Sequence, residues 1–543
     1  MSDGAFARVH ERLDIRRAVA RSSHSSDLLP PRFEDKVGGE VGRRFSDSLL
    51  HLMETGTYAP HTAHFVAVPK SGFTTRLAAL MTLQDRAVYQ ALVETLRERM
   101  DRAVVGPDVL FGPRPLNGTR PWGDFERAPL EGQPTHIVKA DIAGFYEVLP
   151  HEQLATALIT ATGQREIVAA LAAFLTGVMG GNRGLPQGPV PSDFLATFYL
   201  APLDREMIRQ GWRYFRRGDD MRVSVDSFSE GRAAVAAIEE QLRRLRLMLN
   251  PTKSLVLREQ TYRDRLEALD QARDEFRRRL GEERVTRLYE MDDEEIQEIA
   301  EEAGLEEIGW DLYAGGLTID EIVEKLRPHL QPDDADVATA IFNDTIDYAP
   351  WASSPLNREI FHGRLTWSLT VLTAAHSPAA LNHVRTILFR LPDETATVAN
   401  YCAALASTAS EQRMVETVEE YLLPERFRYP WQEGWLLQIL QNSTRWLREE
   451  FVMFVRSVAE REAAEWFARI QATKLLARTG RLEQGLLDRL WQLAPSVFRP
   501  DLIAAANDMT AYSPWAVSVL EGFRGDAVHE VVMAHVTLRR PSP

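Results

Sequence analysis

Three aspartates in the first half of the chain have the surroundings expected of metal ligands. Asp141 ends the apolar run HIVKA, and Asp219 with Asp220 forms an acidic turn that leads into the run MRVSV. Phosphoryl transfer by two divalent ions requires carboxylates from separate segments to meet at one point. Taken singly, an aspartate at a strand end is usually a cap, and an Asp–Asp pair is usually solvated. Together they predict a site for two Mg²⁺ ions, with Mn²⁺ as the alternative, because Mg²⁺ prefers oxygen ligands.

Short strands and helices alternate around these aspartates. β-branched runs bounded by turn residues predict strands over 64–69, 136–142 and 221–225, and a turn followed by a strand over 250–257. Capping residues around periodic apolar residues predict helices over 151–163, 191–211 and 230–249. An interleaved order of this kind predicts an α+β sheet domain with helices on one face.

The sequence changes character after residue 260. Residues 261–335 are dense in both charges and predict solvated helices, as in a connector or a thumb-like region. Farther on, periodic apolar residues alternate with breaks every few tens of residues, which is typical of stacked helix pairs, and nine of the eleven tryptophans follow residue 300. No clean repeat consensus is visible. We therefore predict an N-terminal extension (1–60), an α+β domain (61–260), a charged helical region (261–335) and an all-α, repeat-like domain (336–543).

The charge of the chain is unevenly distributed. The net charge is −15, yet residues 1–260 hold 33 Lys and Arg against 31 Asp and Glu, a balance of +2, and the remainder carries −17. Phosphate binding depends on local basic stripes rather than on the total. The first half can supply such stripes, for example RRLR at 243–246, whereas the second half predicts a surface that repels nucleic acid.

Several other classes of protein lack support. The sequence has no GxxxxGK[ST], HExxH or paired CxxC motif. The single cysteine, Cys402, lies in an apolar run where a small buried residue is expected, and one cysteine cannot form an intrachain disulfide, which fits a reducing compartment. The N-terminus has no apolar leader and the chain has no long apolar stretch. We therefore expect a cytoplasmic protein without a membrane partner.

Six segments resemble motifs of reverse transcriptases, in the order that this family has them. They are FVAVPKSGFTTRLAALMTLQDRAVYQALVE (65–94), VLFGPRP (109–115), VKADIAGFYEVLPHEQL (138–154), GLPQGPVPSDFLATFYLAPLD (184–204), FRRGDDMRV (215–223) and LRLMLNPTKS (245–254). Together they extend over about a third of the chain. The resemblance implies the fingers and palm of a right-hand polymerase. It also implies a nucleotidyltransferase that uses dNTPs and an RNA or DNA template-primer.

The resemblance assigns the metal site and the triphosphate site. Asp141, Asp219 and Asp220 would be catalytic and would ligate the metal ions, with the backbone carbonyl of Ile142 as a further ligand. Lys70 and Arg76 would lie on a hairpin that folds over the triphosphate and neutralises it, or they would be ordinary exposed cations. Lys253 would protonate or steady the departing pyrophosphate, with a surface lysine as a nearly equal alternative.

The resemblance also assigns the nucleotide pocket. Tyr146 would wall the sugar site and exclude a ribose 2′-hydroxyl, or it would be a core aromatic. Gln187 would contact the nucleotide or the template backbone, and Gly184 and Gly188 would let that turn approach closely. The alternative is a plain Pro–Gly loop. We expect His151 to fix the start of its helix rather than to take part in chemistry.

Arg217 departs from the family pattern. Reverse transcriptases usually carry an aromatic residue two positions before the paired aspartates, whereas this chain has Arg217 and hence a GDD sequence that resembles RNA-dependent RNA polymerases. Two features favour DNA synthesis: those enzymes commonly place an acidic residue where Tyr146 stands, and they lack LPQG. Arg217 would contact primer or template phosphate.

A palm followed by a long helical region is similar to bacterial defence reverse transcriptases of the abortive-infection type and their unknown-group relatives, which carry HEAT-like α-helical repeats. This resemblance implies anti-phage defence, with RNA-directed or template-independent synthesis, a noncoding RNA or a protein primer, and self-assembly through the helices. The tyrosines that would prime are Tyr401, Tyr421, Tyr429 and Tyr512, although each is better explained as a core residue. The rival hypotheses are an RNA-dependent RNA polymerase and a catalytically idle, RNA-binding scaffold for the helical domain.

Overall fold

The computed structural model describes residues 4–22, 28–30, 32, 42–70, 74–113, 119–305, 316–347, 355–462, 465–511 and 513–522. Contacts group the chain into two compact units, Met1–Tyr262 with Glu419–Pro543, and Arg263–Val418. The first boundary lies close to the predicted one at residue 260. The second does not coincide with residue 336, because the last helices group with the first half of the chain.

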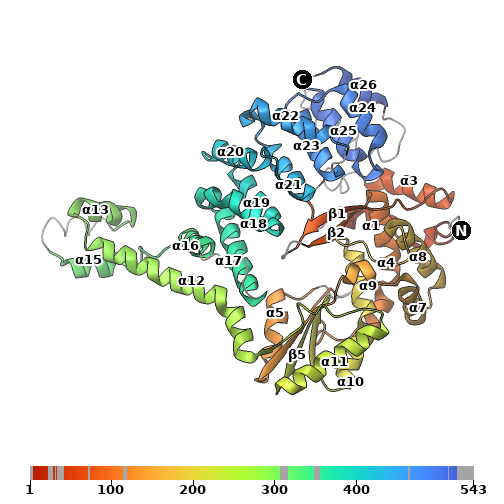
Figure 1. The fold of residues 1–543 in the computed structure, drawn as a ribbon, viewed down its shortest axis with the longest axis horizontal. Helices are drawn as coiled ribbons and strands as arrows, with labels where there is room; N and C mark the ends of the chain where they lie inside the picture. Colours follow the sequence, from red (N-terminus) through yellow and green to blue (C-terminus); the bar gives the residue numbers. More distant parts are fainter. Residues whose placement is uncertain are drawn as a thin grey trace. The chain divides into compact units, whose positions relative to one another are not determined.

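A four-stranded antiparallel sheet, which we call the palm sheet, lies at the centre of the first unit. Its strands, in the spatial order β4-β5-β3-β6, are β3 (His136–Ala140), β4 (Arg213–Arg217), β5 (Asp220–Val225) and β6 (Leu255–Arg258). Helices α10 and α11 pack against one face of this sheet (Figure 1). Met221, Val223 and Val225 of β5 belong to the core between them. The predicted α+β arrangement is therefore present.

Two of the three predicted palm helices differ from the prediction, and two further palm helices, α6 and α8, were not predicted. The helices of the palm are α6 (Phe145–Val148), α7 (His151–Thr162), α8 (Arg165–Met179), α9 (Val190–Tyr199), α10 (Ala201–Arg209) and α11 (Phe228–Arg244). The single helix predicted over 191–211 is wrong: the chain forms α9 and α10, because Pro202 has no N–H for the turn before it and its ring crowds that turn. The helix predicted over 230–249 ends at Arg244, and Arg246 takes a left-handed conformation at φ 55°.

A two-stranded hairpin, which we call the fingers hairpin, pairs β1 (His64–Pro69) with β2 (Thr75–Leu80). Its first strand has the predicted bounds. It leads into the long helix α4 (Leu83–Ala103), and α4 packs on α1, α8 and α9. The remaining elements of the first half are η1 (His10–Arg12), α1 (Ile15–Arg21), α3 (Gly42–Glu54), α5 (Trp122–Arg127) and η2 (Ala128–Leu130).

The C-terminal helices of the same unit brace the fingers hairpin. Helix α21 packs on β1, the His64 imidazole contacts the Glu465 carboxylate, and the His64 and Phe498 rings meet edge to face at 4.9 Å. Trp431 also donates from Nε1 to the Leu28 carbonyl at 2.8 Å. These elements are α21 (Pro430–Leu440), η5 (Thr444–Trp446), α22 (Glu449–Glu460), α23 (Trp466–Arg478), α24 (Gln484–Leu493), η6 (Ser496–Phe498), α25 (Arg499–Met509) and α26 (Trp515–Gly522).

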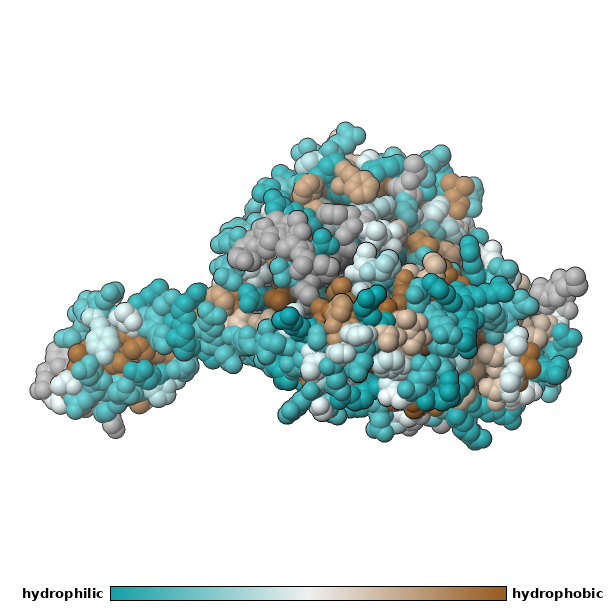
Figure 2. All heavy atoms as spheres, turned by 60° about the horizontal axis from the view of Figure 1, so that its bottom comes forward, coloured by the Kyte–Doolittle hydropathy of each residue, from teal (hydrophilic) through white to brown (hydrophobic). Residues whose placement is uncertain are grey.

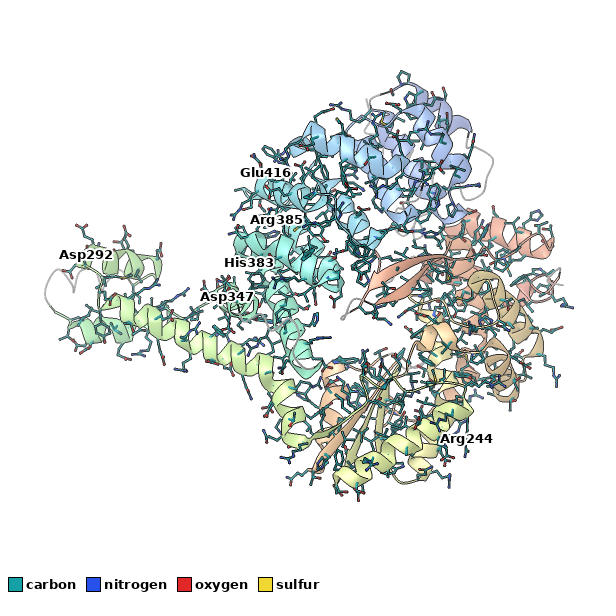
Figure 3. The ribbon with its side chains drawn as sticks, viewed as in Figure 1. Arg244, Asp292, Asp347, His383, Arg385 and Glu416 are labelled. Carbon is teal, nitrogen blue, oxygen red and sulfur yellow. The ribbon has the colours of Figure 1, made fainter. Side chains whose placement is uncertain are left out.

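The second unit is helical throughout its described residues. Its elements are α12 (Glu259–Leu288, whose first turn belongs to the first unit), α13 (Asp293–Glu302), α15 (Ile319–Leu326), α16 (Asp334–Asp347), α17 (Pro355–Ala374), η3 (Pro378–His383), α18 (Val384–Arg390), η4 (Pro392–Glu394), α19 (Thr395–Leu405) and α20 (Glu411–Leu422, whose end belongs to the first unit). Acidic side chains such as Asp292, Asp347 and Glu416 are exposed on it (Figure 3). This accords with the negative charge predicted for the second half.

The face shown in Figure 2 is mostly hydrophilic, with hydrophobic residues in separate small groups. Within the described part of the chain, no helix combines the length and the hydropathy needed to cross a bilayer.

Candidate active site

Strand pairing in the palm sheet brings the three predicted aspartates together. Ala140 at the end of β3 pairs with Met221 of β5, so the next antiparallel step places Asp141 opposite Asp220. Asp219 lies in the turn of the β4–β5 hairpin, where Arg217 pairs with Asp220. One carboxylate oxygen from each aspartate lies within 4.8 Å of the others. We call these residues the acidic triad, and β4, the turn and β5 the acidic hairpin.

The acidic triad concentrates negative charge in a partly buried place. Burial, followed by the negative charges of Asp141 and Asp220, raises the pKa of Asp219 to about 7. Burial also raises the pKa of Asp220, although the Arg222 guanidinium opposes this. Neighbouring carboxylates disfavour one another's ionisation, and bound divalent cations would remove that conflict. The donor set consists of hard carboxylate oxygens, so it fits Mg²⁺.

These pKa shifts predict how the stability of the metal-free protein depends on pH. An unfolded Asp219 titrates near 3.8, whereas the folded one titrates near 7, so between these values the folded state holds a proton that the unfolded chain has lost. Stability should therefore fall as pH rises from about 4 to 7. Thermal melts in EDTA measure this fall, and Asp219→Asn should flatten it. An equal slope in the variant would contradict the assignment.

The segment after α11 supports Asp141 from the other side. The backbone N–H of Asn250 donates to the Asp141 carbonyl at 2.8 Å, and Asn250 Nδ2 donates to Asp141 Oδ2 at 3.0 Å. Lys253 Nζ lies 3.4 Å from the same Oδ2. The structure thus places Lys253 at the acidic triad. Sequence reasoning missed Asn250, which had the pattern of an ordinary turn residue.

The carbonyl of Ile142 is available beside the acidic triad. Ile142 forms an isolated bridge with Leu249. The flanking hydrogen bonds run from Asn250 N–H to the Asp141 carbonyl and from Ala143 N–H to the Met248 carbonyl, the latter at 2.9 Å. This ladder does not use the Ile142 carbonyl, and the role of that oxygen as a metal ligand stays a prediction.

A buried ion pair anchors the acidic hairpin from the core side. Arg216 and Asp204 have fully buried side chains, and Arg216 donates to Asp204 from Nε at 2.7 Å and from Nη2 at 2.6 Å. Tyr214 donates to the same carboxylate at 3.1 Å. Arg216 Nη1 also donates to the Gly218 carbonyl at 2.8 Å, which fixes the turn beside Asp219. Asp204 and Arg216 are therefore positioning residues that the sequence did not reveal.

A second buried ion pair holds the opposite face of the acidic hairpin. Arg222 donates to Glu126 at 2.6 Å, lies 3.5 Å from Asp220, and has its guanidinium 4.8 Å from the Phe125 ring centroid. The Tyr262 hydroxyl donates to the backbone carbonyl of Glu126 at 2.9 Å. Helix α5 and the start of α12 therefore support the strand that carries Asp220.

The segment 109–113 extends the palm sheet and presses against the acidic turn. Phe111 N–H donates to the Arg216 carbonyl at 2.8 Å, and Arg216 N–H donates to the Val109 carbonyl at 2.9 Å. A Cβ atom on Gly112 would lie 2.8 Å from the backbone nitrogen of Gly218. Since backbone cannot yield as a flexible side chain does, only glycine lets these two segments approach.

Gly112→Ala should therefore displace the acidic hairpin. We expect nucleotide incorporation to fall by about tenfold or more, with a loss of about 1–3 kcal/mol in stability from overpacking. Gly106→Ala is the matched control, because a Cβ there meets nothing within 4 Å. Primer extension and thermal melts of both variants measure the two effects. Normal activity in Gly112→Ala would show that the contact between Gly112 and the Gly218 backbone has room for a methyl group.

Tyr146 is held in place by a residue that the sequence did not single out. Its hydroxyl donates to Asp193 Oδ1 at 2.6 Å. Burial, followed by the negative charge of Asp193, raises the pKa of Tyr146 well above its usual value, and Asp219 contributes to the same shift. The tyrosine is therefore a neutral donor, fixed at the first turn of α9 and within electrostatic reach of the acidic triad.

The loop that carries Gln187 fits closely between its neighbours. The Gln187 carbonyl accepts from Ala79 N–H of the fingers hairpin at 3.1 Å. Gly184 has a φ of 90°, and a Cβ there would lie 3.2 Å from the backbone oxygens of Tyr146 and Glu147. His151 begins α7, and its Nε2 lies 2.6 Å from the Gly184 carbonyl. Burial lowers the pKa of His151, which agrees with the structural role expected for it.

The predicted triphosphate cations lie on the fingers hairpin. Lys70 follows β1 and donates its backbone N–H to the Thr74 carbonyl at 2.7 Å, and Arg76 pairs with Val68. Arg76 Nε is buried and has no hydrogen-bond partner among the described residues. No ion pair in that part of the chain joins Lys70 or Arg76 to the acidic triad, so their part in triphosphate binding stays a prediction.

Arg217 lies on the acidic hairpin, but its guanidinium is turned to the segment before α5. It contacts the Arg120 carbonyl, and it lies 5.1 Å from the Trp122 ring centroid. Its desolvation lowers the pKa of Arg217. If Arg217 contacts a nucleic-acid phosphate, it therefore has to use the guanidinium nitrogens that do not donate to the Arg120 carbonyl.

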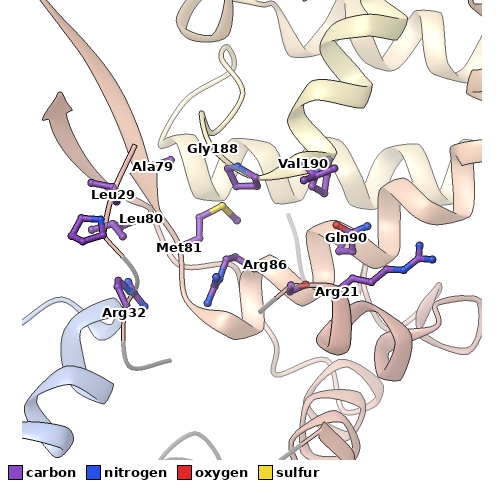
Figure 4. A pocket seen from close by; sticks show the side chains of 14 residues that line it. Arg21, Leu29, Arg32, Ala79, Leu80, Met81, Arg86, Gln90, Gly188 and Val190 are labelled. Carbon is purple, nitrogen blue, oxygen red and sulfur yellow. The ribbon is translucent and has the colours of Figure 1, made fainter. Parts of the chain in front are cut away.

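A basic pocket adjoins the Gln187 loop. It measures about 640 Å³, part of which is open to solvent, and none of its lining residues is acidic. Arg21, Arg32 and Arg86 line it together with Gly188 and Val190, which lie above the arginines in Figure 4. Guanidinium groups over an apolar floor suit a phosphate-bearing strand.

Comparison with known proteins gives the family of this region. Residues 68–276 match the family described as reverse transcriptase (RNA-dependent DNA polymerase). No curated protein matches the chain. The matched residues include the second strand of the fingers hairpin, the palm sheet and the acidic triad. The chain therefore carries a reverse transcriptase domain, and the enzyme class that this domain indicates is a nucleotidyltransferase.

Proposed function

We propose that the chain is a DNA polymerase, RNA-directed or template-independent, that works by two-metal phosphoryl transfer. Asp141, Asp219 and Asp220, with the Ile142 carbonyl, would hold two Mg²⁺ ions, or Mn²⁺ in their place. Ions so held would activate the primer hydroxyl and stabilise the charge on the triphosphate. The observation that carries the proposal is the meeting of three carboxylate oxygens within 4.8 Å at the end of the palm sheet.

The remaining residues would bind and orient the nucleotide. Lys70 and Arg76 would neutralise the triphosphate, and Lys253, already beside Asp141, would assist the departing pyrophosphate. Gln187 would contact the nucleotide or the template backbone. The basic pocket behind the Gln187 loop supports the passage of a phosphate-bearing strand there.

The Tyr146–Asp193 hydrogen bond predicts how the enzyme selects the sugar. A fixed ring beside the nucleotide would exclude a ribose 2′-hydroxyl. Tyr146→Ala should therefore lower the preference for dNTPs over NTPs, measured as a ratio of kcat/KM, by about tenfold or more. Asp193→Ala should lower the same ratio, since it frees the ring. In a Tyr146→Phe background, which already lacks the hydrogen bond, Asp193→Ala should not change the ratio further. If the two changes lower the ratio additively, the hydrogen bond does not position the ring.

A direct experiment tests the proposed reaction. Purified protein is supplied with labelled dNTPs or NTPs and Mg²⁺, with RNA template, DNA template or none, beside the Asp219→Ala, Asp220→Ala variant. Incorporation of dNTPs by the wild type alone supports the proposal. A preference for NTPs would favour an RNA-dependent RNA polymerase, and incorporation by both proteins, or by neither, would overturn it. Sequencing of copurifying nucleic acid identifies the template.

We further propose a role in anti-phage defence in the cytoplasm, with helices that support self-assembly and a noncoding RNA or a protein primer. What supports this role is the long helical region that accompanies the palm. Among the proposed priming tyrosines, Tyr401 and Tyr421 are buried, Tyr429 is half-buried, and Tyr512 lies outside the described residues. Phage plaque counts on cells with the double aspartate variant test the role. Full protection by that variant would favour the idle, RNA-binding scaffold.

A further inference from the structure

Trp122 leaves about half of its side chain open beside the acidic hairpin. It is 49% exposed. The Phe125 ring meets it edge to face at 5.5 Å, and the Arg217 guanidinium lies 5.1 Å from its centroid. An indole with a cation against it and open surface remaining is the kind of platform on which nucleic-acid bases stack.

Strand pairing fixes where this platform lies. Arg217 and Asp220 are direct partners across the acidic hairpin, and side chains of such partners project from the same face of a sheet. The contact of Arg217 with the Arg120 carbonyl fixes its guanidinium on the Trp122 side. The platform therefore lies on the face that carries Asp220, whereas Met221 and Val223 point into the core on the other.

The platform also accounts for the departure at position 217. The aromatic residue expected two positions before the paired aspartates is absent, and Arg217 stands there instead. Trp122 of α5 places an aromatic ring against the Arg217 guanidinium, and Arg217 adds a positive charge. Both properties favour a polyanion with flat bases.

We propose that Trp122 and Arg217 form a stacking subsite for a base of the nucleic-acid strand whose 3′ end is extended at the acidic triad. The base lies on the open indole surface, and the guanidinium N–H groups that do not bind Arg120 reach the adjoining phosphate. The identity of this strand rests on the proposed polymerase function, whereas the affinity for a single strand does not.

Binding without catalysis tests the subsite. Full-length protein in EDTA, without nucleotides, is titrated into fluorescein-labelled single-stranded DNA, and in a second arm into RNA of the same sequence. Trp122→Ala should weaken binding by about tenfold or more, and Trp122→Phe should recover much of the loss. Trp446→Ala is the matched control, since Arg445 lies 4.8 Å from an exposed Trp446 ring on η5, outside the palm. It should bind as the wild type does.

The outcomes separate this proposal from the polymerase itself. Wild-type affinity in Trp122→Ala, or an equal loss in Trp446→Ala, overturns the subsite. If Trp122→Ala does not fold, as thermal melts would show, Trp122→Phe decides: oligonucleotide should quench its tryptophan fluorescence less than that of the wild type, and equal quenching overturns the subsite. Wild-type protein that binds strands but never incorporates nucleotides would overturn the proposed function and leave the subsite standing. The DNA and RNA arms show which strand it prefers.

Discussion

Replacing Asp219 and Asp220 together with alanine should abolish nucleotide incorporation without unfolding the protein. The carboxylates gather where burial and mutual repulsion raise the pKa of Asp219 to about 7, so in the absence of metal the triad is a source of strain rather than of stability. Their removal takes away the ligands that would hold the metal ions. Two-metal stabilisation is worth several kcal/mol, and tenfold in rate corresponds to about 1.4 kcal/mol. A loss of about a thousandfold or more is expected.

A control on the same hairpin makes this result specific. Asp226 follows β5, is largely exposed and lies 3.0 Å from Arg213, so Asp226→Ala removes an acidic residue without touching the acidic triad. It should keep wild-type incorporation. The double variant should melt at or above the wild-type temperature in EDTA and should lose the added stability that Mg²⁺ gives. Residual incorporation within tenfold of wild type would show that the carboxylates do not carry the reaction.

Asp204→Ala should have the largest effect on stability of any single change considered. The change leaves the Arg216 guanidinium buried without its carboxylate partner, and it also removes the acceptor of Tyr214. Breaking a buried pair in this way costs about 3–5 kcal/mol. Because Arg216 also holds the Gly218 carbonyl, surviving protein should incorporate nucleotides poorly. Urea unfolding and primer extension measure the two consequences.

Two comparisons test whether the loss of the buried Asp204–Arg216 pair causes the fall in stability. Arg209 and Glu206 form a pair at the surface of the same helix, α10, in which Arg209 is exposed and Glu206 is half-buried. Glu206→Ala should cost far less stability than Asp204→Ala, since pairs at the surface contribute little. The double change Asp204→Leu, Arg216→Met removes both charges and should recover part of the stability lost in Asp204→Ala. A melt of Asp204→Ala that superimposes on the wild type would contradict the role assigned to this pair.

Local sequence patterns were sufficient for four of the six described strands of the fingers and palm, and they missed β2 and β4. The strand over 64–69 has the predicted bounds, and β5 begins one residue before the predicted 221. The convergence of Asp141 with Asp219 followed from motif order, and the register of β3 with β5 provides its physical cause. The break between α9 and α10 was also readable from Pro202, but the apolar periodicity of 191–211 outweighed it.

Long-range partners could not be predicted from the sequence. Asp193 and Asp204 resemble ordinary helix residues until folding places one against Tyr146 and the other against Arg216. Gly112 lies in a segment whose neighbour across the turn is more than a hundred residues away. The grouping of residues 419–543 with the fingers has the same origin, because amphipathic helices do not encode which surface they will cover.

The packing of residues 419–543 against the fingers delays completion of the fingers during biosynthesis. His64 and its partner Glu465 are separated by 401 positions, so the ribosome must translate most of the chain before the fingers hairpin can acquire its support. Contacts of such sequence separation form late in folding. A nascent chain whose palm has already folded therefore still lacks a braced fingers hairpin. Prematurely terminated products should be released with this hairpin, the proposed triphosphate site, unsupported.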